Sequence, residues 1–489
     1  MTYKEEHEAF VSGTKGTNVL HIAVTGIACL LPVYIRDVCV AAVPGLAKFK
    51  ENLWLGLLLD FIAVIVPLQF TMSVFSENSF QCLFIFFMSF ALIFNIKMRQ
   101  KAIRSVREKV TLTDVKMGNR RPFITYYRAY ANVITAFSIL AVDFKIFPRY
   151  FAKAETYGTG LMDVGVGGFL ITNAVVSPEA RGIIATDRVV PSVLKSLKSS
   201  IPLIVIGMVR VLAVKSTDYQ EHVTEYGVHW NFFFTLAAVK VGCTLLFCTV
   251  SPRLWNIAAV LIIAIYQHNL TYGDLKNYII NGADGKGGRT DLIDANREGL
   301  YSCIGLFSIY IMGVQLGKLV MRKRENVKDW MKLCFALALV SIVCWVLMYF
   351  TGKHVEPVSR RFANLAYLLW MVAFNSMLMF AFLVFDIAVT CLSHLCRIAK
   401  KKESPDHKPE TDTAAPGDDY NTCDLISAIN YNGLFYFLLA NLLTGLVNMS
   451  VKTIYQSNLV AMTILTGYMF LLSSVLYFLY RKKISLKIW

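Results

Sequence analysis

Ionisable residues gather in one stretch, 143–163, which lies between two apolar segments of nearly membrane length. A charged side chain beside hydrocarbon is costly, so such residues usually do chemistry or bind a charged ligand. Asp143 could accept the proton of an alcohol, while Lys153 could orient that carboxylate or stabilise a developing oxyanion. We expect a folded-back loop to bring these two side chains within hydrogen-bond reach, with Arg149 between them as a substrate-binding residue. A structural ion pair that anchors the loop explains Asp143 and Lys153 equally well.

A second polar cluster abuts another apolar segment and contains Glu221, His222, Glu225, His229 and Trp230. On a helix, Glu221, Glu225 and His229 would share one face, which resembles a three-ligand zinc site. However, a glycine interrupts that helix and no standard zinc spacing is present, so the sequence predicts no metal site. We expect these side chains to bind substrate, or to form an ion-pair network at the end of a helix.

Two further stretches combine asparagine and arginine beside apolar segments, and they contain Asn296, Arg297, Arg360, Arg361 and Asn364. Arginine binds phosphate with two parallel hydrogen bonds, so the headgroup of a phospholipid is a sensible ligand. Anchoring at the membrane interface is an equally good explanation of the arginines. The sequence therefore offers all five side chains as candidates for binding substrate.

The composition excludes a soluble globular protein, because 56% of the 489 residues are hydrophobic, only 17% are charged and the mean hydropathy is +0.51. The apolar residues form repeated runs near the ~20 residues that are needed to cross a bilayer. We predict one all-α multi-span membrane domain over residues 1–489. About thirteen transmembrane helices are expected, over 18–35, 53–74, 81–96, 129–143, 161–177, 200–214, 231–249, 254–267, 299–320, 333–350, 364–393, 432–449 and 459–480.

The net charge of +16 is distributed unevenly between the loops. If the loops alternate between two sides and the C-terminus is cytosolic, 32 of the 49 Lys and Arg residues fall in cytosolic loops and 14 in the opposite ones. This positive-inside pattern predicts a lumenal N-terminus and a cytosolic C-terminus. The basic excess thus reports topology and suits contact with membrane lipid, and no nucleic-acid recognition motif accompanies it.

Two of the cytosolic loops stand out by composition. The loop 97–128 is basic, with ten Lys and Arg residues. The loop 400–422 is charged, contains proline and has little apolar surface, so we expect it to be disordered. On the opposite side, Asn269 opens a glycosylation sequon. The polar clusters all fall on predicted lumenal loops or span ends, which favours one polar chamber near the lumenal surface.

Five segments carry a family resemblance, and they follow one another over most of the chain as 141–167, 219–233, 295–299, 359–365 and 432–449. They include Phe147-Pro-Arg149 and the stretch from Glu221 to Trp230. Together they resemble the glycosylphosphatidylinositol (GPI) anchor inositol acyltransferases of the endoplasmic reticulum, the PIG-W family, and most of all its fungal members. One departure is Tyr150, where the family usually has a second arginine.

The resemblance implies transfer of a fatty acyl group, typically palmitoyl, from acyl-CoA to the inositol of glucosaminyl-phosphatidylinositol, without a further cofactor. It also implies a thirteen-span fold in the endoplasmic reticulum membrane, with a lumenal site and Asp143 and Lys153 as the catalytic pair. No cysteine or serine has a recognisable nucleophile setting, which favours direct transfer. Two other interpretations stay open, a lipid transporter or flippase, and a non-catalytic subunit of a lipid-modifying complex. The polar residues in or near spans that suit a transporter are Arg210, Lys240, Asn375 and Asp386.

Overall fold

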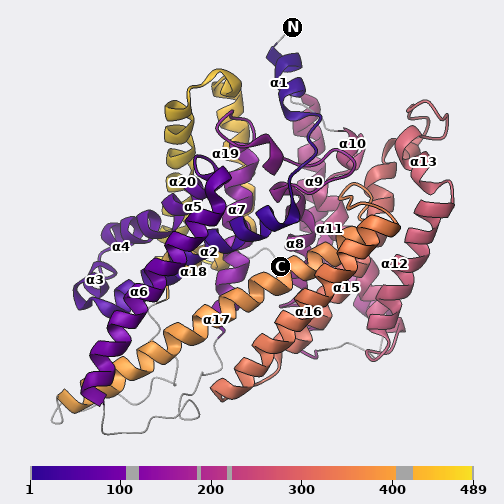
Figure 1. The fold of residues 1–489 in the computed structure, drawn as a ribbon. Coiled ribbons are helices and arrows are strands. Elements are labelled where there is room, and N and C mark those ends of the chain that lie inside the picture. Colours follow the sequence, from indigo (N-terminus) through magenta and orange to yellow (C-terminus); the bar gives the residue numbers. More distant parts are fainter. Residues whose placement is uncertain (1–2, 106–120, 184–188, 217–222, 404–421, 487–489) are drawn as a thin grey trace.

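The structure is a computed structural model, and it describes residues 3–105, 121–183, 189–216, 223–403 and 422–486. Across these ranges the regular structure is helical, apart from a single isolated β-bridge. The helices pack side by side in one bundle, with short helices and loops at its ends (Figure 1). This arrangement confirms the prediction of an all-α, multi-span membrane protein.

Ten of the predicted spans coincide with helices that are long and apolar enough to cross a membrane. They are α2 (Val19–Ala42), the continuous run of α4 (Leu53–Asp60), η1 (Phe61–Ile65) and α5 (Val66–Met72), α6 (Ser79–Ser105), α9 (Val189–Ser216), α11 (Phe232–Thr249), α15 (Arg297–Met321), α16 (Val327–His354), α17 (Leu365–Glu403), α19 (Gly433–Ser450) and α20 (Asn458–Arg481). The other three predicted spans meet helices that are shorter or more polar, namely α7 (Pro122–Ala141), α8 (Val164–Ala174) and α12 (Trp255–Tyr272). The count of thirteen and the sides of the two termini therefore stay predictions.

The remaining helices are short and lie between the long ones. They are α1 (Tyr3–Val11), α3 (Pro44–Phe49), η2 (Ser76–Asn78), η3 (Arg149–Phe151), η4 (Leu161–Asp163), α10 (Val223–Tyr226), α13 (Leu275–Asn281), α14 (Leu292–Ala295), α18 (Asp424–Tyr431) and η5 (Thr453–Tyr455). Both predicted cytosolic loops are partly helical at their edges, because α6 and α17 continue into them and α7 begins within the basic one. The rest of these loops, 106–120 and 404–421, lies outside the described residues.

Two helices, α7 and α8, carry the loop on which the candidate catalytic residues lie. The helix α7 packs against α17, α18 and α19, while α8 packs against α15, α17 and α7. Close packing of α8 on α17 depends on Gly167, since a Cβ there would lie 2.4 Å from the Cγ of Met371. Small residues allow this approach of helices in a membrane. The two ends of the loop between α7 and α8 are thus anchored in helices that each pack against several others.

Candidate active site

The loops that the charge distribution assigns to the lumenal side meet at one end of the bundle. The N-terminal segment contacts the loop between α7 and α8, which we call the α7–α8 loop (142–163), and α10 contacts the same loop. Figure 1 shows α1, α10 and α13 at this end of the molecule. The structure therefore brings together the polar clusters that lie far apart in the sequence.

Asp143 directly follows the last turn of α7 and is buried, with 6% of its surface exposed. The side-chain amide of Asn448 donates to Asp143 Oδ2 at 2.7 Å, and His7 Nε2 lies 3.3 Å from Asp143 Oδ1. Within the part of the chain that the structure describes, no arginine or lysine forms an ion pair with this carboxylate. Asp143 is thus held by an amide and an imidazole rather than by a permanent cation.

His7 reaches Asp143 because the segment after α1 is bonded to the α7–α8 loop. The N–H of Thr17 donates to the carbonyl of Thr159 at 2.6 Å, and Gly16 pairs with Thr159 in the isolated bridge. Gly16 has a φ of +78°, and a Cβ there would lie 2.3 Å from the Thr159 carbonyl oxygen, so only glycine permits this approach. Sequence reasoning missed this segment, and glycine at 16 was the one weak signal of it.

Lys153 belongs to a second set of contacts on the same loop. Its Nζ donates to both carboxylate oxygens of Glu225, at 2.9 and 2.8 Å, and its side chain is 40% exposed. Arg360 bonds Glu225 at 3.0 Å and also Asp163 Oδ1 at 2.8 Å. Asp163 Oδ2 in turn accepts the N–H of Ala154, which is next to Lys153, at 3.0 Å. These contacts close a ring that fixes the position of Lys153.

The direct hydrogen bond that the sequence allowed between Asp143 and Lys153 is absent from the described contacts, because each has its own partners. Arg360 holds the second set together electrostatically. Burial by itself lowers the pKa of Arg360, but Glu225 and Asp163 outweigh burial and raise its pKa above the usual value. Since its charge is taken up by these two carboxylates, Arg360 is a positioning residue for Lys153 rather than a free phosphate ligand.

Arg149 differs from the other candidate arginines. Its Nη2 donates to the carbonyl of Val142 at 2.6 Å, and its guanidinium lies 4.1 Å from the centre of the Phe10 ring. Its Nε and Nη1 are buried and have no hydrogen-bond acceptor among the described residues. Burial lowers the pKa of Arg149 to about 10, although the nearby charge of Asp143 opposes that change. Two nitrogens of this cation, close to Asp143, are therefore candidates for binding an anion.

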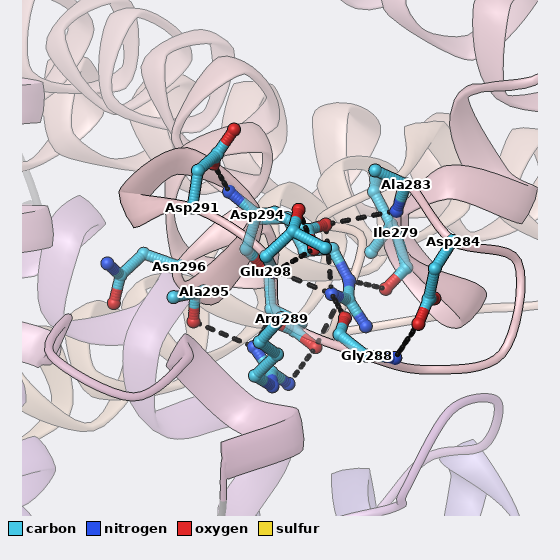
Figure 2. A network of polar contacts seen from close by, with 12 residues as sticks. Ile279, Ala283, Asp284, Gly288, Arg289, Asp291, Asp294, Ala295, Asn296 and Glu298 are labelled. Atoms are coloured by element: carbon cyan, nitrogen blue, oxygen red, sulfur yellow. Dashed lines mark hydrogen bonds and ion pairs between the residues drawn. The ribbon is translucent and has the colours of Figure 1, made fainter.

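Arg297, by contrast, is enclosed by the loop between α13 and α15. It is 1% exposed, and its nitrogens donate to Asp294 Oδ1 at 3.0 Å, to the Ile279 carbonyl at 3.0 Å and to the Gly288 carbonyl at 2.9 Å. Figure 2 shows this polar network, which also joins Asp294 to the backbone of Ala283. The backbone N–H of Thr290 contributes most to the lowered pKa of Asp294. Arg297 is therefore held within the scaffold by its own loop, and its role in binding substrate stays a prediction.

Asn296 holds the backbone of the second polar cluster through hydrogen bonds. Its Oδ1 accepts the backbone N–H groups of His229 and Trp230, at 2.7 and 2.8 Å. The imidazole Nδ1 of His229 is buried and has no hydrogen-bond partner in the ranges that the structure describes. Glu221 and His222 lie outside the described residues. In the remainder, no three His, Cys, Asp or Glu side chains are grouped as metal ligands.

The last pair of predicted residues also has structural partners. Arg361 donates to Glu298 Oε1 at 3.3 Å, and Arg289 bonds both oxygens of the same fully buried carboxylate. Burial lowers the pKa of Arg361, while Glu298 opposes that change. Asn364 accepts the N–H of Tyr367 at 3.0 Å and so caps the start of α17. Both residues position loops at this end of the bundle.

Outside the loops, two of the four polar side chains that suggested transport bond to neighbouring helices. Tyr127 donates to Asn375 Oδ1 at 2.6 Å, and Lys240 donates to the carbonyl of Ser199 at 3.3 Å. The sequon asparagine Asn269 is exposed on the last turn of α12. Its glycosylation stays a prediction.

Comparison with known proteins identifies the family of this chain. The GWT1 family model matches residues 3–479. The glucosaminyl-phosphatidylinositol-acyltransferase PIGW of Bos taurus is 38% identical and that of Homo sapiens 34% identical, and each alignment covers 100% of both chains. The GPI-anchored wall transfer protein 1 of Emericella nidulans is 32% identical over 97% of this chain and 96% of its own length. The motifs alone suggested fungal members, whereas the identity to the bovine protein is higher. This chain belongs to the GWT1 family.

Proposed function

We propose that this chain is an O-acyltransferase of GPI-anchor biosynthesis in the endoplasmic reticulum membrane. It transfers a fatty acyl group, typically palmitoyl, from acyl-CoA to the inositol hydroxyl of glucosaminyl-phosphatidylinositol. Two findings support this proposal: the full-length similarity to mammalian proteins named for that acceptor lipid, and a polar site at one end of a membrane bundle. The partners that we propose are these two substrates and the surrounding lipid.

The observation that carries the proposal is the setting of Asp143. Asp163, on the same loop, already has a donor on each oxygen: Arg360 bonds one, and two backbone N–H groups bond the other. Asp143 instead has His7 and Asn448 as partners. It is therefore the carboxylate of this loop that is suited to accept a proton.

The reaction then follows from the positions of the side chains on the α7–α8 loop. Asp143 takes the proton of the inositol hydroxyl while the hydroxyl oxygen attacks the carbonyl carbon of the thioester. Negative charge develops on the carbonyl oxygen, and the ammonium of Lys153 stabilises it. The C–S bond breaks, and the CoA thiolate leaves and takes up the proton. The products are the acylinositol lipid and CoA with a free thiol.

The neighbouring groups make these steps compatible with the geometry. An ammonium has three N–H donors, and Glu225 accepts two from Lys153, so one donor remains for the oxyanion. His7 lies next to Asp143 and can accept the proton from its carboxylic acid form. The unpartnered donors of Arg149 suit the phosphate of the acceptor lipid.

The test is transfer by detergent-purified protein from radiolabelled palmitoyl-CoA to glucosaminyl-phosphatidylinositol. We compare the intact chain with Asp143→Asn and with a matched control, Asp274→Asn, which alters an exposed aspartate. Acylinositol product from the intact chain and the control, but not from Asp143→Asn, would support the proposal. Normal turnover by Asp143→Asn would remove its role as base. A folded intact chain without product would favour a transporter or a non-catalytic subunit.

A further inference from the structure

A second polar site lies at the opposite end of α7 and α8 from the candidate active site. It is a cavity of about 530 Å³, and its polar lining consists of Arg121, Thr125, Arg128, Arg181, Lys323 and Asn430. Arg121 directly precedes α7, whose other end leads to Asp143, and Arg181 follows α8, whose other end begins at Asp163. We call it the basic cavity, and no group used in the proposed reaction lines it.

The four cations of the basic cavity have no acidic partners. None of them forms an ion pair with any residue that the structure describes, and none of the residues that line the cavity is acidic. Arg121 donates to the carbonyl of Met321 at 2.7 Å, but its Nε is buried and has no partner in the described part of the chain. Arg128 donates to Asn430 Oδ1 at 3.1 Å. Burial lowers the pKa of Arg121, and the charge of Arg181 lowers it further.

The positive-inside bias does not by itself explain why several cations line one cavity. The positive-inside bias needs only cations near the membrane surface, and exposed residues such as Lys195 and Arg253 meet that need. Cations that converge on one cavity repel one another, and a bound anion would offset that cost. Guanidinium groups match the geometry of phosphate oxygens, and the first turn of α7 adds partial positive charge.

We propose that the basic cavity binds the phosphate groups of a ligand with more than one negative charge. Two sources have this chemistry: the 3′-phosphoadenosine diphosphate end of acyl-CoA, and the phosphorylated headgroup of an inositol lipid. The nucleotide source rests on the proposed acyltransferase function, whereas the phosphate site itself does not. With the orientation that the charge distribution predicts, the cavity faces the cytosol, where acyl-CoA is made.

The experiment measures binding to the intact purified chain in nanodiscs, without acceptor lipid. One arm titrates 3′-phosphoadenosine 5′-phosphate, and the other a short-chain phosphatidylinositol phosphate. The double variant Arg128→Gln, Arg181→Gln removes two cations, Arg128→Lys keeps charge but loses the two-pronged geometry, and the exposed Arg253→Gln is the matched control. Thermal unfolding of each variant verifies that it is folded.

We expect the double variant to bind one of the probes at least about tenfold more weakly, Arg128→Lys to be intermediate, and the control to match the intact chain. Weakening of the nucleotide probe assigns the cavity to acyl-CoA, and weakening of the lipid probe assigns it to the lipid. If both probes bind the folded double variant as they bind the intact chain, the proposal is overturned. Binding is measured without transfer, so the two proposals can fail separately. A chain that is inactive in the acyltransferase assay, but whose double variant binds a probe more weakly, would contradict the proposed function and still support the phosphate site.

Discussion

Two aspartates close the two ends of the α7–α8 loop, and their surroundings differ in kind. Asp163 is fully buried and bonds Arg360 and the N–H groups of Ala154 and Gly160, so its charge is matched on both oxygens. Asp143 is nearly as buried, but its partners are the amide of Asn448 and the imidazole of His7. The first carboxylate fixes the shape of the loop. The second has no arginine or lysine partner among the described residues, and burial alone does not distinguish the two.

The sharpest way to break this comparison is to neutralise each aspartate in turn. Asp143→Asn keeps the size of the side chain and its hydrogen bonding but removes the base, so we expect transfer to fall by about 10³-fold with the thermal unfolding temperature unchanged. Asp163→Asn leaves Arg360 with one charged partner fewer in a buried site, and we expect about 3–5 kcal/mol of lost stability. Initial rates and thermal unfolding measured on the same preparations distinguish these outcomes. Identical behaviour of the two variants would refute the comparison.

Lys153 tests whether the ring of contacts serves the chemistry. Lys153→Ala removes the cation beside the developing oxyanion, and we expect kcat to fall by about 10²-fold. Glu225→Gln keeps Lys153 but weakens its positioning, so its effect should be smaller and should appear in kcat rather than in KM. Steady-state kinetics with varied acyl-CoA concentration measure kcat and KM of both variants. If Lys153→Ala had normal kcat, Lys153 would be an anchor of the loop.

Substitution of His7 tests whether its imidazole takes part in proton transfer from Asp143. If the imidazole accepts the proton from Asp143, His7→Phe should lower kcat by about tenfold. His7→Asn restores a polar contact to Asp143 but cannot accept the proton, so its kcat should fall similarly. Steady-state kinetics measure both, and a normal kcat in His7→Asn would mean that His7 only packs against the site.

The smallest expected effect distinguishes Arg149 from Arg297. Arg149→Gln should raise the KM for the acceptor lipid by about tenfold, with kcat nearly unchanged, because it removes two nitrogens that have no acceptor among the described residues. Arg297→Gln should instead lower the unfolding temperature, since it leaves Asp294 and several buried carbonyls without donors. Acceptor-dependence curves and thermal unfolding measure both. A stable Arg297→Gln variant with weak acceptor binding would reverse the assignment.

The fold could be predicted from the sequence because each long helix is one apolar run with polar ends. Prediction from apolar runs fails for α7, α8 and α12, because these helices are shorter or more polar. For them, length and hydropathy do not decide whether the helix crosses the membrane. The charge distribution between loops also predicted which polar clusters share one end of the bundle. That inference succeeded because alternation through a membrane constrains every loop at once.

The individual roles in the site could not be predicted in the same way. Arg149 and Arg297 are the same residue type beside apolar segments. Only the folded structure shows that Arg297 bonds a carboxylate and several carbonyl groups, whereas two nitrogens of Arg149 have no acceptor among the described residues. His7 lies on a short helix without any recognisable motif, more than 130 positions before its partner in the sequence. Residue type indicates which chemistry is available, whereas hydrogen bonds over long sequence separations decide which residues perform it.

The partners of Asp143 have a consequence for the synthesis of the protein. One partner, His7, is made before Asp143, and the other, Asn448 in α19, lies 305 residues after it. Domains form as the chain emerges, but these contacts are complete only after α19 has been made and inserted. A chain that stops before α19 lacks the amide that holds the carboxylate. We therefore expect chains truncated before α19 to lack transfer activity, even where the α7–α8 loop is already made.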